Sequence, residues 1–348
     1  MKSLERILNT FEGKPVDRVP LYDYLFQKEL FEKLIGVRPE SYNIHQAIEC
    51  AKILHHDMVA CFVGNAEDFD MPVDENGEYT DEFGTVFAIR EEVSWPVNAP
   101  VQFPVSDWDS YKCLKYPDPA AKGRTDELIE GLKKNNDELA ISAGIEGPFT
   151  RIWMLMGPEE LFILLHTEPD LIKTIFNDMT DYLIACAKHI EAASPHVFSI
   201  AEDLGASAGP FISLPMFREF VLPSLEKLVS SINIPVFFHS CGNINLYMDD
   251  LVDLGLKAIH PLQRTANMDL RKMKEKYGDR ITLVGNVDSS RTLPYGSIED
   301  VERETLECLE IGKPGGRYIL ASDHSLHDGI PIENIVHMFE TGLKYGQY

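Results

Sequence analysis

The stretch of sequence that decides the fold is Ile234-Pro-Val-Phe-Phe-His-Ser-Cys-Gly-Asn-Ile244. Its apolar run predicts a buried strand, and the pair Gly242-Asn243 is typical of a turn that ends it. His239 and Cys241 stand two positions apart, so on an extended strand both side chains point to the same face. An imidazole and a thiolate side by side form half of a zinc site. With a third ligand the protein is a metalloenzyme; without one, this is a strand with a core cysteine and a polar tip.

The same kind of apolar segment recurs along the chain, alternating with amphipathic helical patterns. We expect eight strands: Val19–Tyr24, Met58–Val63, Ala140–Ile145, Phe198–Ala201, Val236–His239, Ala258–Pro261, Ile281–Gly285 and Tyr318–Ala321. Such alternation predicts an α/β fold with parallel strands inside and helices outside. At 348 residues we expect a (β/α)8 TIM barrel that forms a single domain over residues 1–348. A doubly wound open sheet is the alternative, but Gly205-Ala-Ser-Ala-Gly does not fit the G-x-G-x-x-G turn of a dinucleotide binder.

Apolar residues at helical spacing predict a helix over Pro169–Ala193 with Thr167 as its N-cap. A second helix over Met216–Ser230 should be capped by Ser213 and kinked by Pro223. Two further helices are expected over Glu299–Ile311 and Pro331–Lys344.

One region, Glu67 to Pro104, breaks the alternation, because it is rich in acidic residues, proline and glycine. We expect an inserted β-hairpin near residues 67–104, with its turn near Asp81–Gly84.

Charge and composition exclude several classes of partner. The net charge of −24 and the pI of about 4.8 argue against nucleic acid and anionic membranes, because both require basic patches. No apolar run approaches the ~18 residues of a membrane-spanning helix, and the N-terminus resembles a helix start rather than a signal peptide. The six cysteines include no C-x-x-C pair and indicate reduced thiols in a cytoplasmic protein, with Cys61 and Cys186 in the core.

Seven of the eight expected strands end in polar residues that core packing does not require. The ends are Asp23-Tyr24, Glu146-Gly-Pro-Phe-Thr, Glu202-Asp203, His239-Ser-Cys241, His260-Pro-Leu-Gln263, Gly285-Asn286-Val-Asp288 and Ser322-Asp323-His324. Barrel enzymes place their chemistry at this end of the strands, so the pattern predicts an active site there. We expect Asn286 and Asp288 to contribute to cofactor binding.

The best third ligand for a metal is His324, which follows an apolar strand as His239 does. Two histidines and one cysteine suit Zn²⁺, and a fourth position left to Glu202, Asp203, water or substrate is typical of a catalytic site. His327, close by on a loop, is a competing candidate for the third ligand. In the structural alternative, His324 caps the next helix and His239 makes hydrogen bonds within the barrel mouth.

The acids allow a second mechanism. Glu146, Glu202 and Asp203 on adjacent strands could act as general acid and base without a metal, since crowded carboxylates raise one another's pKa. The structural alternative is an ion pair with Arg151 or Arg218.

Motifs along most of the chain resemble those of the uroporphyrinogen decarboxylase-like superfamily, and within it the corrinoid-dependent methyltransferase branch. They are Glu5-Arg-Ile-Leu with Pro15-Val-Asp-Arg-Val-Pro, Asp81-Glu-Phe-Gly, Gly147-Pro-Phe-Thr, Glu202-Asp-Leu-Gly, Ser213, Phe217-Arg-Glu-Phe with Pro223, His239-Ser-Cys-Gly-Asn, Gly285-Asn-Val-Asp and Pro331-x-Glu-Asn. The stretch Leu21–Leu30 lacks the segment rich in Arg, Gln and Gly with which decarboxylases grip porphyrin carboxylates, and this acidic chain shows few cationic clamps.

The methyltransferase branch binds zinc through H-x-C and a late cysteine, whose place is taken here by His324. The resemblance therefore implies a zinc enzyme that moves a methyl group from a small donor to a corrinoid carried by a partner protein, since the chain lacks a D-x-H-x-x-G corrinoid motif. The donor could be a methoxylated aromatic, methanol or a methylated amine. Aromatic residues near the mouth would suit a planar ring or a cation–π contact, or simply pack: Tyr22, Tyr24, Phe62, Phe149 and Trp153.

Two other functions stay open at this point. One is a metal-independent decarboxylase of the uroporphyrinogen decarboxylase type that uses the same carboxylates. The other is a non-catalytic barrel that binds a small molecule or a corrinoid protein, although passive pockets are mostly apolar. A homodimer is a further possibility.

Overall fold

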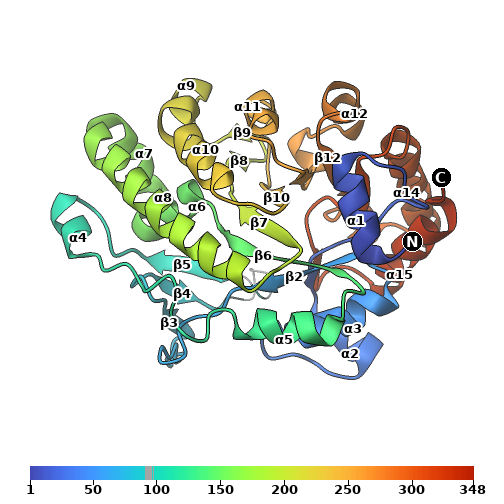
Figure 1. Cartoon of the computed structure of the whole chain (residues 1–348), viewed down its shortest axis with the longest axis horizontal. Coiled ribbons are helices and arrows are strands. Elements are labelled where there is room, and N and C mark those ends of the chain that lie inside the picture. Colours follow the sequence, from blue (N-terminus) through green and yellow to red (C-terminus); the bar gives the residue numbers. More distant parts are fainter. Residues whose placement is uncertain (91–95, 97) are drawn as a thin grey trace.

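Seven parallel strands form the centre of the structure, a computed structural model that describes residues 1–90, 96 and 98–348. They are paired in the order β13-β12-β11-β10-β7-β6-β2. Their bounds are β2 Met58–Phe62, β6 Ala140–Glu146, β7 Val197–Ala201, β10 Val236–His239, β11 Ala258–His260, β12 Thr282–Val287 and β13 Tyr318–Ser322. Figure 1 shows helices surrounding the curved sheet, as the predicted TIM barrel requires, and the barrel prediction is confirmed.

The first expected strand, Val19–Tyr24, is not a regular strand. Only one bridge, Leu21 to Leu320, joins it to β13, while the amide of Asp57 donates to Leu21 O at 2.7 Å on the side of β2. The segment thus lies between the two edge strands and occupies the place of the eighth strand. Pro20 has no N–H to donate to a ladder, which explains why regular pairing fails here. Pairing resumes only between β1 (Leu25–Phe26) and β14 (Leu326–His327).

The helices follow the expected amphipathic pattern closely. Those before β7 are α1 Ser3–Glu12, α2 Lys28–Ile35, α3 Ile44–Ile53, α4 Trp108–Cys113, α5 Asp126–Asn135, α6 Pro148–Met156, α7 Pro158–Thr167 and α8 Pro169–Ala192. Those after it are α9 Leu214–Met216, α10 Leu222–Ser230, α11 Met248–Asp253, α12 Leu270–Tyr277, α13 Thr292–Tyr295, α14 Ile298–Gly312 and α15 Ile332–Tyr345. Strands β8 (Gly205–Ala206) and β9 (Gly209–Pro210) form a small hairpin after β7.

Two local predictions about helices need correction or refinement. Thr167 does not cap α8; it ends α7, and its hydroxyl donates to Ile163 O at 3.1 Å. Ser213 does cap the next helix, because its Oγ accepts the amide of Met216. The disturbance expected at Pro223 appears just before it as a π-helical turn over Phe217–Val221.

The inserted region forms a small antiparallel sheet of three strands: β3 (Glu78–Thr80), β4 (Val86–Ala88) and β5 (Ala99–Gln102). The predicted hairpin is the pair β3–β4, and its turn closes where the amide of Gly84 donates to Asp81 O at 3.0 Å. Gly84 has a φ of 89°, a conformation that favours glycine. The third strand was not expected.

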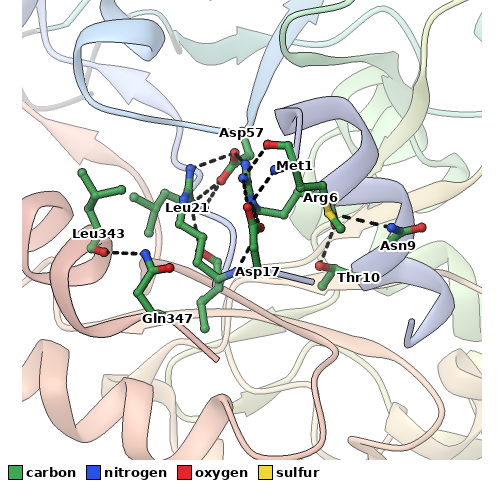
Figure 2. A network of polar contacts seen from close by, with 11 residues as sticks. Met1, Arg6, Asn9, Thr10, Asp17, Leu21, Asp57, Leu343 and Gln347 are labelled. Atoms are coloured by element: carbon green, nitrogen blue, oxygen red, sulfur yellow. Dashed lines mark hydrogen bonds and ion pairs between the residues drawn. The ribbon is translucent and has the colours of Figure 1, made fainter. Parts of the chain in front are cut away.

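A buried ion network closes the opposite, N-terminal end of the barrel. Asp57, fully buried before β2, pairs with Arg6 at 2.6 Å and with Arg18 at 2.8 Å, and also accepts the amide of Leu21. Figure 2 shows Arg6 reaching both Asp57 and Asp17. Because these contacts join the chain's beginning to a central strand, this end of the barrel stabilises the fold, as in other barrels of this type.

The cysteines fit the expectation of reduced thiols. All six are free, and Cys61 and Cys186 are buried, as predicted. Within the part of the chain that the structure describes, no helix is both long enough and apolar enough to span a bilayer.

Candidate functional site

His239, at the C-terminal end of β10, lies in a cluster that includes some of the predicted site residues. In the sheet, His239 is in register with His260 on β11 and with Ala201 on β7. The two histidine rings are in contact through a hydrogen bond of 2.8 Å between their Nδ1 atoms. The chain then turns at Gly242, whose φ is 77°, and a Cβ there would meet Gly205 O at 2.1 Å. Only glycine therefore fits at this turn, which packs directly against Gly205.

Three more potential ligands lie in the same region as His239. Its Nε2 is 3.8 Å from Oδ1 of Asp203, which follows β7. The same carboxylate accepts the backbone amide of Cys241 at 3.4 Å. The ring of His324, beyond β13, stands edge-on to His239 with a centroid distance of 6.0 Å. The structure thus brings together His239, Cys241, His324 and Asp203 from three different loops.

Burial sets the protonation of these groups. Desolvation lowers the pKa of His239 to about 4, against an opposing effect of Asp203. Desolvation likewise lowers the pKa of His324, whereas burial and the Asp203 carboxylate raise the pKa of the Cys241 thiol. Neutral imidazoles keep the lone pair that a metal needs, and a bound cation would favour loss of the thiol proton.

The donors fit zinc in chemical type, since two imidazoles, a thiol and a carboxylate are all zinc ligands. The contact behind His239 fits as well, because metal-bound histidines use their second ring nitrogen for a hydrogen bond that orients the ring. Among the described residues, however, no three His, Cys, Asp or Glu side chains converge tightly enough to hold a metal ion. The competing ligand His327 contacts Ser289 O through Nε2 at 2.9 Å and belongs to β14.

The carboxylate of Glu202 is hydrogen-bonded to the backbone of the next helix. Its carboxylate is fully buried and accepts the amides of Phe149 at 2.9 Å and Thr150 at 2.8 Å, which caps the start of α6. Burial raises the pKa of Glu202 to about 8, although these amides act in the opposite direction. Its contacts therefore give it a role in anchoring α6 to β7.

Glu146 forms an ion pair with Arg151, which was the structural alternative to a role as general acid or base. It contacts Arg151 at 2.6 Å, and Arg151 also lies 3.6 Å from Asp81 in the inserted hairpin. Burial disfavours the charged form of Glu146, but the charge of Arg151, a backbone hydrogen bond and the hydrogen bond from Arg151 together outweigh it and lower the pKa of this acid. Arg218, the other arginine considered, pairs with Asp250 instead. Asp203 is therefore the acid that lies directly beside His239.

Asn286 and Asp288 are engaged in backbone contacts away from His239. The buried amide of Asn286 donates to Leu262 O and Met268 O, at 3.0 and 3.3 Å. Asp288 accepts the amides of Ser290 and Arg291 and so shapes the turn into α13. These contacts suggest that both residues hold the loops after β11 and β12 in place.

A cavity of about 620 Å³ opens beside this centre. Its walls include Ala201 and Glu146 at the strand ends, together with residues of the inserted hairpin and of α8. Many of its lining residues are aromatic: Tyr24, Phe26, Tyr42, Phe62, Tyr79, Phe83, Phe87 and Tyr182. Tyr24 also contacts His239, with ring centroids 5.7 Å apart. The cavity and the histidine cluster are therefore neighbours.

The charged groups of the cavity wall are paired with one another. Arg151 lies between Glu146 and Asp81, and Arg124 forms a close pair with Glu82 at 2.7 Å. These two arginines face three carboxylates, so the wall carries a net negative charge. A cavity of this size, with aromatic walls and paired polar groups, is typical of a small-molecule site.

Sequence reasoning missed two functional neighbours. From the sequence alone, His260 was named only as a polar residue at a strand end. In the structure, the register of β10 and β11 pairs it with His239. Asp81 was taken for part of a turn, yet the hairpin carries it to Arg151. Histidine at the ends of two consecutive strands was a sequence signal for His260. Nothing in the sequence around Asp81 indicated its contact with Arg151.

Comparisons with known proteins identify a matching family and similar sequences. The profile of the family "Uroporphyrinogen decarboxylase (URO-D)" matches residues 81–345. The methylcobamide:CoM methyltransferase MtaA of Methanosarcina barkeri is 25% identical over 347 residues, covering 95% of this chain and 94% of that protein. The methylated-thiol–coenzyme M methyltransferase of Methanosarcina mazei is 25% identical over 217 residues, covering 62% of this chain and 56% of that protein.

Among solved structures, a methyltransferase from Methanosarcina mazei has the same fold. It superposes with a TM-score of 0.75 over 99% of each chain, at 22% identity. The resemblance inferred from the motifs is confirmed, as is the fold class.

Proposed function

Because the chain belongs to the uroporphyrinogen decarboxylase (URO-D) family, we propose that it is a zinc-dependent member of the methyltransferase branch that moves a methyl group from a small donor to a corrinoid protein. The observation that carries this proposal is the meeting of His239, Cys241, His324 and Asp203 beside an aromatic cavity. Relatives named as methylcobamide:CoM methyltransferases support corrinoid chemistry.

His239, Cys241 and His324 would hold the metal, and the fourth position would be left for the donor. Zinc bound there would supply Lewis-acid polarisation of the donor's oxygen or nitrogen. Asp203 lies beside His239, with its carboxylate 3.8 Å from His239 Nε2 and 36% of its side chain exposed. It is thus placed to orient the donor, while the buried ring of His260 excludes water from behind.

The ligand set favours demethylation of a small donor over activation of a thiol. His324 stands where the resemblance leads one to expect a late cysteine. A site with one thiolate and two imidazoles donates less electron density to the metal than a site with two thiolates. It is consequently the better Lewis acid toward oxygen and nitrogen.

The cavity favours a flat, uncharged or cationic donor, such as a methoxylated aromatic. Phe62 is 44% exposed and contacts Tyr42, with centroids 4.9 Å apart, so its ring offers a free surface in the wall. Glu146 and Asp81 outnumber Arg151 in the wall, which disfavours an anionic donor. The same pairing opposes porphyrin decarboxylation, because a polyanion requires cations that are free to bind it.

The proposed site also implies a partner protein and a cellular compartment. The corrinoid would come on a partner protein that docks over the C-terminal mouth of the barrel, and we treat residues 1–348 as one catalytic domain. We place the reaction in the cytoplasm, since all six cysteines are free and Co(I) chemistry requires reducing conditions.

The test is methyl transfer to cob(I)alamin, followed by the absorbance of methylcobalamin. Zinc-loaded and zinc-stripped protein would each receive 2-methoxyphenol, 4-hydroxy-3-methoxybenzoate, methanol or trimethylamine. We expect zinc-dependent transfer, fastest from 2-methoxyphenol and slower from the benzoate.

The matched pair of variants is Cys241→Ala and Cys113→Ala, since Cys113 is an exposed cysteine of α4. Only the first should lose activity. Equal activity in the stripped protein, or full activity of Cys241→Ala, would overturn the proposal.

A further inference from the structure

We propose that Glu146 accepts a hydrogen bond from a hydroxyl group of the methyl donor, so that the preferred donors are neutral methoxylated phenols. Glu146 would thereby select the donor of the methyl transfer proposed above, on which this assignment rests. The recognising group belongs to the cavity wall and needs no metal to bind the donor.

Glu146 stands in one row with His239 across the sheet. Glu146, at the end of β6, is in register with Ala201 of β7, and Ala201 is in register with His239 of β10. Side chains in such a row point to the same face, and neighbouring strands are about 4.8 Å apart, so about 10 Å separate the backbones of Glu146 and His239. The residue between them contributes only a methyl group to the cavity wall. A small ring lying over Ala201 would have one edge at Glu146 and the other toward His239.

Of the carboxylates described in the cavity wall, that of Glu146 is the most accessible to a ligand. The exposed fraction of its side chain is 39%, against 15% for Asp81 and 12% for Glu82. Glu82 is held by two hydrogen bonds from Arg124, at 2.7 and 2.9 Å. A ligand that seeks an acidic acceptor in this wall therefore meets Glu146 first.

Arg151 determines which kind of group Glu146 can bind. Its guanidinium donates to Oε2 of Glu146 at 2.6 Å and lies 5.1 Å from the centroid of the Phe83 ring. A carboxylate offers about four acceptor sites, so one bond from Arg151 leaves capacity for a ligand. The positive charge beside Glu146 favours its ionised form, which is an acceptor only.

The pairing with Arg151 also excludes charged partners for this carboxylate. A second cation gains little at a carboxylate whose charge is already balanced, and an anionic donor would be repelled by it. A neutral hydroxyl can use the remaining lone pairs of Glu146 in a charge-assisted hydrogen bond. The aromatic walls of the cavity supply the surface for a ring that carries this hydroxyl.

The expected effect is a preference between two similar ligands, 2-methoxyphenol and methoxybenzene, of which the second lacks the hydroxyl. A hydrogen bond to a charged group should make the wild type bind 2-methoxyphenol about 10–100-fold more tightly than methoxybenzene. Both dissociation constants would be measured by isothermal titration calorimetry on the full chain without a corrinoid, so that the result does not depend on methyl transfer.

Two variants separate recognition by Glu146 from a general effect on the wall. Glu146→Leu should bind the two ligands with affinities within about threefold of each other, because the acceptor is lost. Asp81→Asn removes the other carboxylate beside Arg151, 3.6 Å away, and should keep the wild-type preference. A purely structural role of Glu146 would weaken the binding of both ligands together and leave their ratio unchanged.

Equal affinities in the wild type, or a preference that survives Glu146→Leu, would overturn the assignment. If the Leu variant does not fold, Glu146→Gln decides, since it keeps the length of the side chain and removes its charge. The preference should then fall by about threefold or more, and an unchanged preference would overturn the assignment.

The same measurements distinguish this assignment from the proposed function. Methyl transfer from methanol or trimethylamine, by a wild type that does not discriminate between the two aromatic ligands, would overturn the role of Glu146 and leave the proposed function standing. A wild type that shows the preference but transfers no methyl group would support Glu146 as a binding residue and overturn the proposed function.

Discussion

The ring of Tyr24 stands edge-on to that of His239, with centroids 5.7 Å apart and planes at 78°. Tyr24 belongs at the same time to the wall of the cavity, where it stacks with Phe26 at 5.2 Å. One side chain thus connects the candidate metal centre with the space in which a donor would bind.

If aromatic surface binds the donor, Phe62→Ala should raise KM for 2-methoxyphenol by about tenfold, equivalent to ~1.4 kcal/mol, and change kcat less. Phe62 is half-exposed, so its removal should cost little stability. Ile53→Ala provides the control, because Ile53 is similarly exposed on α3 but lies outside the cavity wall. Steady-state kinetics would show the difference; an unchanged KM for Phe62→Ala would contradict a donor site at this wall.

Two substitutions decide whether His324 or His327 is the third zinc ligand. His324→Ala should weaken zinc binding on the order of 100-fold or more, because it removes a ligand rather than a supporting bond. His327→Ala should leave zinc binding unchanged, since that ring contacts Ser289 O and the amide of Gly329. Chelator competition measures both. The reverse order of effects would transfer the third ligand to His327.

Asp23 should make the fold less stable as the pH rises. Burial raises its pKa to about 8 in the folded protein, despite hydrogen bonds from Ser322 and Tyr24 that act against this. In the unfolded chain its pKa is near 4, so between roughly pH 4 and pH 8 the folded state holds one more proton. The unfolding free energy then falls by up to ~1.4 kcal/mol per pH unit in this window.

Asp23→Asn removes this titration and should make the fall of the unfolding free energy with pH less steep in urea unfolding, while Glu202, whose pKa burial also raises to about 8, keeps part of the slope. Asp109→Asn, at a fully exposed position of α4, serves as the control and should leave the slope unchanged. An identical slope in Asp23→Asn and wild type would show that Asp23 is ionised in the folded protein.

The network at the opposite end of the barrel should contribute stability rather than activity. Asp57→Asn leaves Arg6 and Arg18 without their buried partner, which should cost about 3–5 kcal/mol in urea unfolding. Asp250→Asn breaks the partly exposed pair with Arg218 and should cost much less stability. Loss of methyl transfer by the folded Asp57→Asn protein at low temperature would contradict this division of roles.

The strands could be predicted well because buried parallel strands are short apolar runs bounded by turns. Val19–Tyr24 has that composition too, but Pro20 interrupts the ladder, and only tertiary contacts show that the segment still fills the eighth position. The polar residues at the strand ends made it possible to predict that His239, Cys241, His324 and Asp203 lie in one region, because the barrel topology brings the ends of the strands together.

The roles of the acids could not be predicted in the same way. Glu202 and Asp203 are neighbours in sequence, yet one accepts amides of α6 while the other faces His239. That division depends on the direction of each side chain at the end of β7. The ion pair of Glu146 depends on α6 carrying Arg151 back toward it, and was foreseen only as an alternative.

The zinc content of the purified protein tests the central claim most directly. Wild-type protein grown with zinc and freed of loosely bound metal should hold one zinc per chain by elemental analysis. The double variant His239→Ala, Cys241→Ala should hold none while remaining folded. A wild type without zinc, or a double variant that keeps it, would contradict the account.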